Sequence, residues 1–417
     1  MKVRVTFARC AAGVLALASA CRAPTPIAPP LAPPVVTVVA VPAEDPAARE
    51  PPFVPSGLAR STSTTWASAA RSSVVAAPLL RFSALVRTDA LTTAPRALLV
   101  NDAGDRLAVD YGETYAVRER RGALQGQGRK LAGDPLVLGA AQVFGAGVSG
   151  ASSDSDVTWA LRVSQGEVIS VVQHASHGVN RHVALRGGGV AEVFDQTPIT
   201  TSVVVARVVG EGPFSVEARR EARIEGPAVG AIAADGRVTV ATGDRRLLVY
   251  DAMHDAPDRV MKPVTTRALG FVPRDLALVD GKAVLFESVP GATVVHALDA
   301  NGAESWQASV PFVAHAPPID GGAGRVYVAG DGLAAVLGGK ILWSDGGKGP
   351  FFVTALASGA LLVAVGPELR VVGKDGARLT TLRVPEGDTI VAPPAVAADG
   401  EVWVATAKGI YVVVHPA

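Results

Sequence analysis

Tight turns of the Asp-Gly kind recur at even spacing along the second half of this chain, and a short β-type segment follows each of them. The clearest begin at Asp235, Asp280, Gly321, Ser358 and Asp399, so the spacing averages 41 residues. Two-residue turns of this chemistry tolerate positive φ and favour β-hairpins. A repeat of about 40–45 residues with several short strands is typical of one four-stranded blade of a β-propeller. Because a single blade would expose an apolar face, the repeat predicts a closed ring of blades.

Three less regular turn points, near Asp102, Asp154 and Pro198, extend the series toward the N-terminus. Together the eight points lie about 42 residues apart on average, which is the length of one blade. This spacing favours eight blades over seven.

The last repeat has three strand segments, at 395–400, 402–406 and 409–414, and the sequence then stops at Ala417. A fourth strand is therefore missing from this blade. We expect a strand near the start of the propeller, over 79–86, to complete it and to cover two open sheet edges.

The segments that follow the turns have the composition of β-strands. Residues 237–242, 325–329 and 401–406 are rich in β-branched and aromatic residues and are bounded by Gly or Asp. No apolar stripe with helical spacing extends beyond about three turns. The charged stretch 217–223 has a helical composition, but it fits a solvated outer strand equally well. The sequence therefore predicts one all-β propeller domain over 75–417.

The first 20 residues have the pattern of a signal peptide. Lys2, Arg4 and Arg9 precede a short apolar run, and the small residues 18–20 are suited to signal peptidase. The apolar run is too short to span a bilayer as a helix. Of the two cysteines, Cys10 lies in the removed segment, so the mature chain would begin at the other one and could form no internal disulfide.

The stretch Leu17-Ala18-Ser19-Ala20-Cys21 resembles the lipobox of bacterial lipoproteins, in which the first residue of the mature chain is a lipidated cysteine. The family pattern prefers Leu three residues before the cysteine, where this chain has Ala18. The resemblance implies that Cys21 carries acyl chains that anchor the protein to a membrane. The alternative is ordinary secretory cleavage before Cys21, which would leave a free thiol.

A proline-rich tether over 21–74 is predicted between this cysteine and the propeller. Eleven prolines lie between Arg22 and Pro55, and proline fixes φ and removes backbone donors. In a polyproline conformation, at about 3.1 Å per residue, some 30 residues would reach roughly 100 Å. The apolar stretch 35–41 could instead pair as a stray strand, and the Ser/Thr-rich stretch 61–73 either completes the tether or begins the fold.

Residues 294–306, VVHALDANGAESW, resemble the quinoprotein-like (PQQ-like) repeat, whose strand-turn-strand unit has the pattern A-L-D-x-x-T-G-x-x-x-W. Asp299, Gly302 and Trp306 match the Asp, Gly and Trp of that pattern, although one residue is missing before the Gly and Asn301 replaces the usual Thr. The resemblance implies a propeller in which the Trp of one blade packs against the next.

Weaker copies of the motif lie at 248–252, 338–343 and 371–376. By the same resemblance, Trp343 is expected to have the role of Trp306. These motifs predict a scaffold and do not specify a reaction.

The redox members of the quinoprotein-like group bind pyrroloquinoline quinone and calcium, with a catalytic Asp and often a disulfide over the cofactor. Here the predicted propeller contains no cysteine, and no Asp can be placed on their catalytic motif. We therefore expect no quinone-dependent dehydrogenase activity, no cofactor and no catalytic residue.

Several weaker chemical signals have structural explanations. Residues 145–150 fit G-x-G-x-x-G but lead into a Ser/Asp-rich stretch and not a helix, so a loop between blades is expected in place of a phosphate site. His174, His177 and His182 could offer imidazoles to zinc or copper, but no acidic or thiolate partner has ligand spacing, and a solvated loop explains them better. Asp299 to Gly302 resembles the start of a calcium loop, yet it lacks the later carboxylates, and a hairpin turn accounts for it.

The sequence has no recognisable nucleophile motif, and its one basic cluster has a structural explanation. No G-x-S-x-G elbow is present. A local basic cluster could face an acidic partner, although a charged outer strand explains it better; it comprises Arg118, Arg120, Arg121, Arg129 and Lys130.

Net charge excludes one class of partner. With 39 basic and 38 acidic residues the formal charge is +1, so the chain lacks the global positive field that nucleic-acid binding needs.

In layout, with a lipidated cysteine before eight quinoprotein-like blades, the chain is similar to the propeller lipoproteins of the outer-membrane β-barrel assembly machine. We therefore predict a monomeric, non-catalytic propeller of the bacterial envelope that binds another envelope protein through its loops. It would be an outer-membrane lipoprotein if Cys21 is acylated, and secreted or periplasmic otherwise. The alternatives are a ligand- or polymer-sensing propeller that uses its central channel, and a quinone-dependent or hydrolytic enzyme.

Overall fold

The computed structural model describes part of the chain, and all of that part belongs to the compact unit Pro34–Ala417. The described residues are 74–75, 82, 84–100, 106–112, 114–120, 124–129, 137–138, 142–148, 156–162, 167–173, 180–185, 189–197, 200–208, 216–234, 237–251, 260–299, 302–347, 349–397 and 399–414. The predicted signal peptide, Cys21 and nearly all of the predicted tether lie outside them. Within the described residues, no helix has the length and apolar character needed to cross a bilayer.

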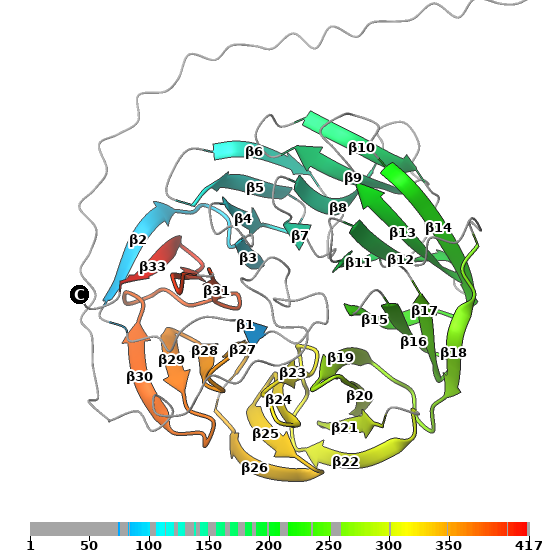
Figure 1. Ribbon diagram of the computed structural model, residues 1–417. Helices are drawn as coiled ribbons and strands as arrows, with labels where there is room; N and C mark the ends of the chain where they lie inside the picture. The colour runs from blue at the N-terminus through cyan, green and yellow to red at the C-terminus, as the bar shows by residue number, and fades with distance from the viewer. Residues whose placement is uncertain are drawn as a thin grey trace, which may run out of the picture. The chain divides into compact units, whose positions relative to one another are not determined.

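The described strands pair into eight sheets that follow one another around a central axis (Figure 1). The first three sheets comprise β3 (Ala97–Val100), β4 (Arg106–Asp110), β5 (Thr114–Glu119) and β6 (Leu124–Arg129); β7 (Val137–Leu138), β8 (Gln142–Val148), β9 (Asp156–Arg162) and β10 (Glu167–Gln173); and β11 (Asn180–Leu185), β12 (Gly189–Thr197), β13 (Thr200–Val208) and β14 (Val216–Glu225).

The next three sheets comprise β15 (Ala228–Ala234), β16 (Arg237–Thr242), β17 (Arg246–Asp251) and β18 (Pro263–Ala268); β19 (Asp275–Val279), β20 (Lys282–Val289), β21 (Ala292–Leu298) and β22 (Glu304–Val310); and β23 (Ile319–Asp320), β24 (Arg325–Ala329), β25 (Leu333–Leu337) and β26 (Lys340–Asp345). The last two comprise β27 (Phe351–Leu356), β28 (Leu361–Val365), β29 (Glu368–Val372) and β30 (Arg378–Arg383), joined by β1 (Val74–Val75); and β31 (Ala395–Val396), β32 (Val402–Ala405) and β33 (Gly409–Val414), joined by β2 (Ala84–Ala90).

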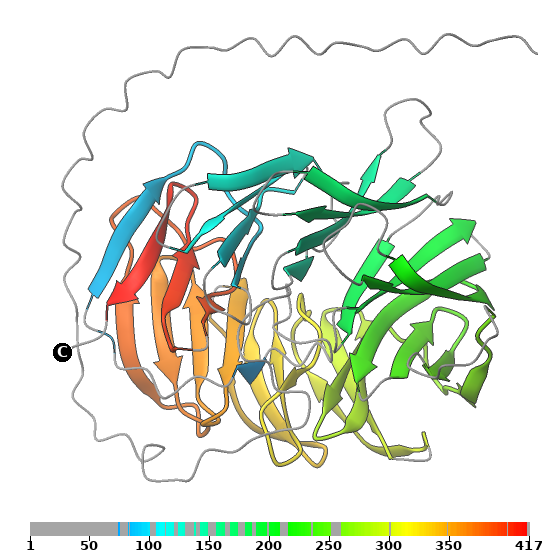
Figure 2. The same cartoon turned by 45° about the horizontal axis from the view of Figure 1, so that its top comes forward.

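Apart from the added strands β1 and β2, the strands of each sheet keep chain order, with the first strand toward the axis (Figures 1 and 2). This arrangement is the predicted all-β propeller.

The last sheet is completed by the N-terminal strand, as predicted. Strand β2 pairs antiparallel with β33, from Ala84 opposite Val414 to Ala90 opposite Gly409. Strand β2 covers 84–90 and so shares 84–86 with the predicted range 79–86, of which 79–81 and 83 lie outside the described residues. Phe82 and Leu85 are 6% and 1% exposed in the core between this sheet and the β27–β30 sheet, so burial of these two side chains accounts for the register.

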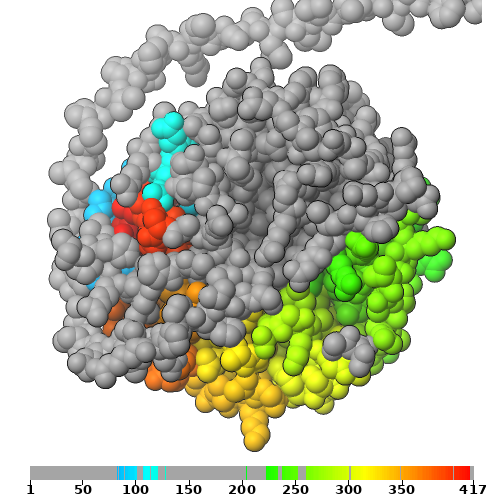
Figure 3. All heavy atoms as spheres, in the orientation of Figure 1, coloured from blue at the N-terminus to red at the C-terminus, as the bar shows by residue number. Residues whose placement is uncertain are grey.

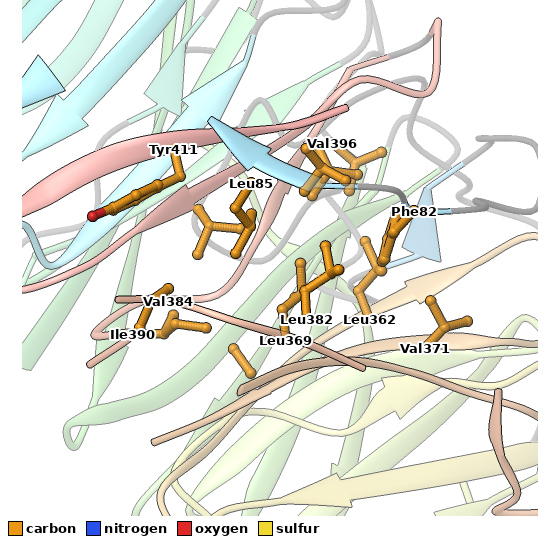
Figure 4. Close-up of a cluster of buried hydrophobic side chains, with 14 of the residues drawn as sticks. Phe82, Leu85, Leu362, Leu369, Val371, Leu382, Val384, Ile390, Val396 and Tyr411 are labelled. Carbon is orange, nitrogen blue, oxygen red and sulfur yellow. The ribbon is translucent and has the colours of Figure 1, made fainter. Parts of the chain in front are cut away.

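The apolar core lies between neighbouring sheets. Along β24, Val326 and Val328 pack toward the β19–β22 sheet, whereas Tyr327 and Ala329 pack toward the β27–β30 sheet. Figure 4 shows the corresponding core around Leu85 and Leu362. Because the middle strands are buried on both faces, they have continuous apolar sequences, and each fully buried aliphatic side chain contributes about 1.5–3 kcal/mol.

Hydrogen bonds between neighbouring sheets repeat the sequence period. The backbone N–H of Asp280 donates to the Asp320 carboxylate, and the Thr354 hydroxyl donates to the Pro394 carbonyl; both pairs are 40 residues apart. The guanidinium of Arg274 likewise donates to a carbonyl 40 residues along the chain. The repeat in the sequence is therefore also the repeat in space.

A β-bulge recurs near the start of the outer strands. In β18, β22, β26 and β30, one residue of the outer strand has no partner on the third strand. These unpaired residues are Val264, Ser305, Leu342 and Leu379. A bulge bends the strand and re-aims the side chain that it carries.

Two turn points inferred from the sequence are wrong. The points near Asp154 and Pro198 fall between the second and third strands of their sheets, whereas the first strands of these sheets end at Leu138 and Leu185. The error near Pro198 arises because β12, β13 and β14 have nine, nine and ten residues and lengthen that repeat. Residues 217–223 lie in the outer strand β14, so the helical alternative is also wrong.

Candidate functional site

Most of the metal and lipid candidates lie outside the described residues. Cys21, His174 and His177 are among these, and His182 is placed only as part of strand β11. Residues 145–148 of the G-x-G-x-x-G match lie in strand β8, so the expected loop is wrong for that part.

The matched quinoprotein-like motif forms the outer turn of the β19–β22 sheet. The N–H of Gly302, whose φ is +78°, donates to the Asp299 carbonyl over 2.9 Å. The Asp299 carboxylate accepts the N–H of Ala303 at 2.9 Å. A Cβ at Gly302 would lie 2.8 Å from Cγ of Arg267 in the preceding sheet. The carboxylate thus bonds to its own turn.

The two tryptophans of the repeat follow the bulges and cover turns of the next sheet. The indole N–H of Trp343 donates to the Lys374 carbonyl over 2.9 Å, and a Cβ at Gly376 would lie 2.9 Å from the indole ring. Trp306 also lies beside a turn of the next sheet, since a Cβ added at Gly339 would be 3.5 Å from Cβ of Trp306 and 3.0 Å from the Gln307 carbonyl oxygen. Both contacts join adjacent sheets and give these residues a structural role.

A buried histidine that the sequence did not single out joins three strands. His296, on β21, is 3% exposed. Its Nδ1 lies 2.6 Å from Oε2 of Glu304 and its Nε2 lies 3.1 Å from Oε2 of Glu287. Its ring stacks on Phe271 with centroids 3.5 Å apart. Each ring nitrogen of His296 therefore faces a carboxylate oxygen of a neighbouring strand.

This histidine cluster does not form a metal site. The two glutamates bind opposite nitrogens of one ring, so their oxygens do not converge on a common point. Across the described ranges, no three His, Cys, Asp or Glu side chains gather in a way that could hold a metal ion. The sequence also has no cysteine after Cys21.

Asp320 is a buried carboxyl group at the inner end of its sheet and is 1% exposed. Oδ1 accepts the N–H of Gly322 at 2.8 Å, and Oδ2 accepts the N–H of Asp280, in the adjacent sheet, at 3.3 Å. Burial raises the pKa of Asp320 to about 6, although the two hydrogen bonds act to lower it. The Asp320 carboxyl group thus links two sheets and has a pKa of about 6.

One residue of the predicted basic cluster, Arg120, forms ion pairs within the fold. Arg120 lies 2.7 Å from Oδ2 of Asp399 and 3.8 Å from Oε2 of Glu401, in the turn between β31 and β32. Partial burial acts to raise the pKa of Asp399, but the hydrogen bond and charge of Arg120 hold it below its usual range. Arg118 lies on β5, whereas Arg121 and Lys130 are outside the described residues. The Arg120 side chain is thus committed to a contact between sheets.

An exposed apolar surface lies on the hairpin of β25 and β26, which we name the outer hairpin. Leu337, Ile341 and Leu342 are 38%, 42% and 47% exposed. Gly338 and Gly339 form its tip with φ of +54° and +80°, a geometry suited to a two-residue hairpin turn. Figure 3 shows this part of the chain, in yellow to orange, at the lower rim of the molecule.

The two ends of strand β26 differ in their surroundings. Leu342 is the bulge residue of β26, and the equivalent residue of β18, Val264, is 59% exposed. At the far end of β26, Asp345 lies 3.4 Å from Arg370 and 3.2 Å from Arg378 of the next sheet. The strand is therefore fixed at one end while its apolar end faces solvent.

Comparisons with known proteins identify the fold. No model of a protein family and no curated protein sequence matches the chain. Among solved structures, quinohemoprotein alcohol dehydrogenase ADHIIG from Pseudomonas putida HK5 is similar at a TM-score of 0.56 and 11% identity, covering 88% of this chain and 80% of that one. Sqt1 from Chaetomium thermophilum, bound to the N-terminus of ribosomal protein L10, is similar at 0.51 and 11%, covering 78% and 97%. BamB from Moraxella catarrhalis matches at 0.44 and 14%, covering 81% and 100%.

The similarity to quinohemoprotein alcohol dehydrogenase supports the resemblance to quinoprotein-like propellers at the level of fold. At such low identity these similarities do not carry a reaction or a partner to this chain, since one fold hosts many functions. Of these three proteins, the two with TM-scores above 0.5 are an enzyme and a protein described in a peptide complex.

Proposed function

We propose that this protein is a non-catalytic propeller scaffold that is anchored at a bacterial cell envelope and binds another envelope protein. The outer hairpin carries the proposal. Exposed aliphatic side chains that cluster on one rigid hairpin are typical of contact surfaces. In the described residues the ionisable clusters at His296 and Asp320 are buried and hold strands and sheets together, which favours a structural role for them over catalysis.

The N-terminal sequence supports the envelope part of the proposal. The signal-peptide pattern would export the chain, acylation of Cys21 would anchor it, and the proline-rich tether would let the propeller reach partners away from the membrane. The mature chain would have no second cysteine for a disulfide, so the apolar cores between the sheets supply its stability.

The experiment is crosslinking in intact envelopes, followed by recovery of the full-length protein. We expect a specific envelope protein to be recovered with the natural chain and lost with Ile341→Asp and Leu342→Asp. Thr266→Asp is the matched control, because Thr266 is also exposed on an outer strand but is already polar. Circular dichroism and thermal unfolding establish that each variant is folded. Recovery of only background proteins by the natural chain would contradict the scaffold function, and equal recovery by the Leu342 variant would contradict the role of the hairpin.

A further inference from the structure

Strand β1 is an addition to the propeller pattern. It lies on the axial side of β27, so its sheet has the order β1-β27-β28-β29-β30. Val74 pairs with Ala355 and Val75 with Leu356, in parallel. Every other strand pair in the described part of the chain is antiparallel. In Figures 1 and 2, β1 lies on the inner side of the orange sheet.

Strand β1 occupies the edge of β27 that faces the axis. The first strand of a blade has one paired edge, toward the second strand, and one edge that faces the axis. The backbone groups of that axial edge need hydrogen-bond partners. In the described residues, the first strands of the other sheets have no fifth strand beside them. The axial edge of β27 is thus the edge on which this fold accepts an extra strand.

The surroundings of this edge are rigid and apolar. Ala355 and Leu356 are 1% and 2% exposed, and they belong to the cores on opposite faces of the sheet. The Thr354 hydroxyl donates to the Pro394 carbonyl at 2.8 Å, which ties β27 to the next sheet. A strand fixed in this way presents its backbone edge in one conformation, so adding a peptide costs little further ordering of the propeller.

The occupant has a matching sequence. Residues 72–77 are Ser-Ser-Val-Val-Ala-Ala, which carry no charge and include two β-branched residues at the paired positions. Such residues favour the extended conformation, and the absence of charge suits an edge that faces the inside of the ring.

We propose that the axial edge of β27 is an acceptor site for an extended, uncharged, β-branched peptide, and that the chain occupies this site itself with Val74 and Val75. The acceptor works by strand addition, in which backbone hydrogen bonds give the affinity. Because the occupant belongs to the same chain, its effective concentration is on the order of millimolar. The site therefore excludes external peptides until Val74 and Val75 leave, and its ligand would be a strand-forming segment of another protein. This inference does not depend on the outer hairpin.

The first test examines the site in trans. A fluorescein-labelled peptide with the sequence of residues 72–77 is titrated into the full chain and into the Val74→Pro/Val75→Pro variant. Proline removes the backbone donors that a strand needs, so the variant should bind the peptide at least 10-fold more tightly than the natural chain. Ala47→Pro/Ala48→Pro, in a segment already rich in proline, is the control and should bind as the natural chain does. No gain in binding by a variant with unchanged circular dichroism and unfolding temperature would overturn the acceptor site.

The second test examines occupancy in cis. Val74→Cys/Ala355→Cys should form a disulfide on mild oxidation, because directly paired strand residues come close enough for one. Val74→Cys/Ala277→Cys places the second cysteine on β19, the first strand of another sheet, and should not. Peptide mapping by mass spectrometry separates these bonds from any that involve Cys21. Absence of the Val74 to Ala355 bond in folded protein would overturn occupancy by the chain itself, whatever the outcome of the envelope crosslinking.

Discussion

The buried carboxyl group of Asp320 makes the stability of the propeller depend on pH in a predictable direction. Its pKa is about 6 in the folded protein and 3.8 as the ordinary value. For an acid whose pKa is raised by folding, the folded state binds the proton more tightly than the unfolded state. The stabilisation is complete below about pH 4 and is lost as the pH rises through about 6.

The magnitude follows from the size of the shift. A difference of about two pKa units corresponds to about 3 kcal/mol between pH 4 and pH 7. Because Asp320 is almost fully buried, solvent does not screen this effect greatly. Asp320→Asn removes the titration, but it also replaces one of the two accepting oxygens with an NH2 group, so one of the two N–H groups loses its acceptor. Loss of this hydrogen bond lowers the free energy of unfolding of the variant by the same amount at every pH.

The assay is urea unfolding of the natural chain and the Asn variant at pH 4, 5, 6 and 7. Other titrating groups are common to both proteins, so the quantity to compare is the difference between their free energies of unfolding. We expect the advantage of the natural chain over the variant to fall by about 3 kcal/mol from pH 4 to pH 7. Asp299→Asn, which removes a carboxylate from a surface turn, controls for the loss of an acidic residue. A difference that stays constant within about 0.5 kcal/mol across this range would refute the reasoning.

Three further predictions concern the packing, the anchor and the chemistry. Gly376→Ala should destabilise the fold by about 1–2 kcal/mol in thermal unfolding, because φ is +85° and the new Cβ would lie 2.9 Å from Trp343; Gly346→Ala, where nothing lies within 4 Å, should change it little, and equal effects would contradict this account. Mass spectrometry of the mature N-terminus should find an acylated Cys21, whereas an unmodified thiol would end the lipoprotein interpretation. Pyrroloquinoline quinone with calcium should produce no dye reduction with alcohols or sugars, and clear turnover would show that residues outside the described ranges complete a redox site.

The local parts of the fold were predictable from the sequence because hairpins are specified by nearby residues. Turns such as Asp280-Gly281 and Asp399-Gly400 lie between first and second strands as expected, and Asp280, Gly281 and Gly400 have positive φ. Strands β12 and β13 have nine residues each. The turn near Pro198 therefore lies between the second and third strands of its sheet, and the prediction that it follows the first strand was wrong.

The candidate sites were harder to predict because they form between segments that are far apart in the sequence. The contact between Trp343 and Gly376 was anticipated only through the resemblance to a known repeat. No sequence motif predicted that His296 lies between two glutamates. Glu287, His296 and Glu304 come from three strands, and the register of these strands decides whether the side chains meet. Leu342 lies at a bulge of β26, which was not predicted from the sequence.

The sequence by itself determined that this chain forms a ring of β-sheets, because periodic turns and β-branched segments leave each blade with an apolar face that only a neighbour can cover. It also determined that a strand from the N-terminal side would be needed for the last blade. Only the tertiary structure decided which residues supply that strand, which carboxyl groups are buried between sheets, and on which edge β1 lies. These outcomes depend on burial and on pairing between distant segments, whose energies are set by the closed ring as a whole.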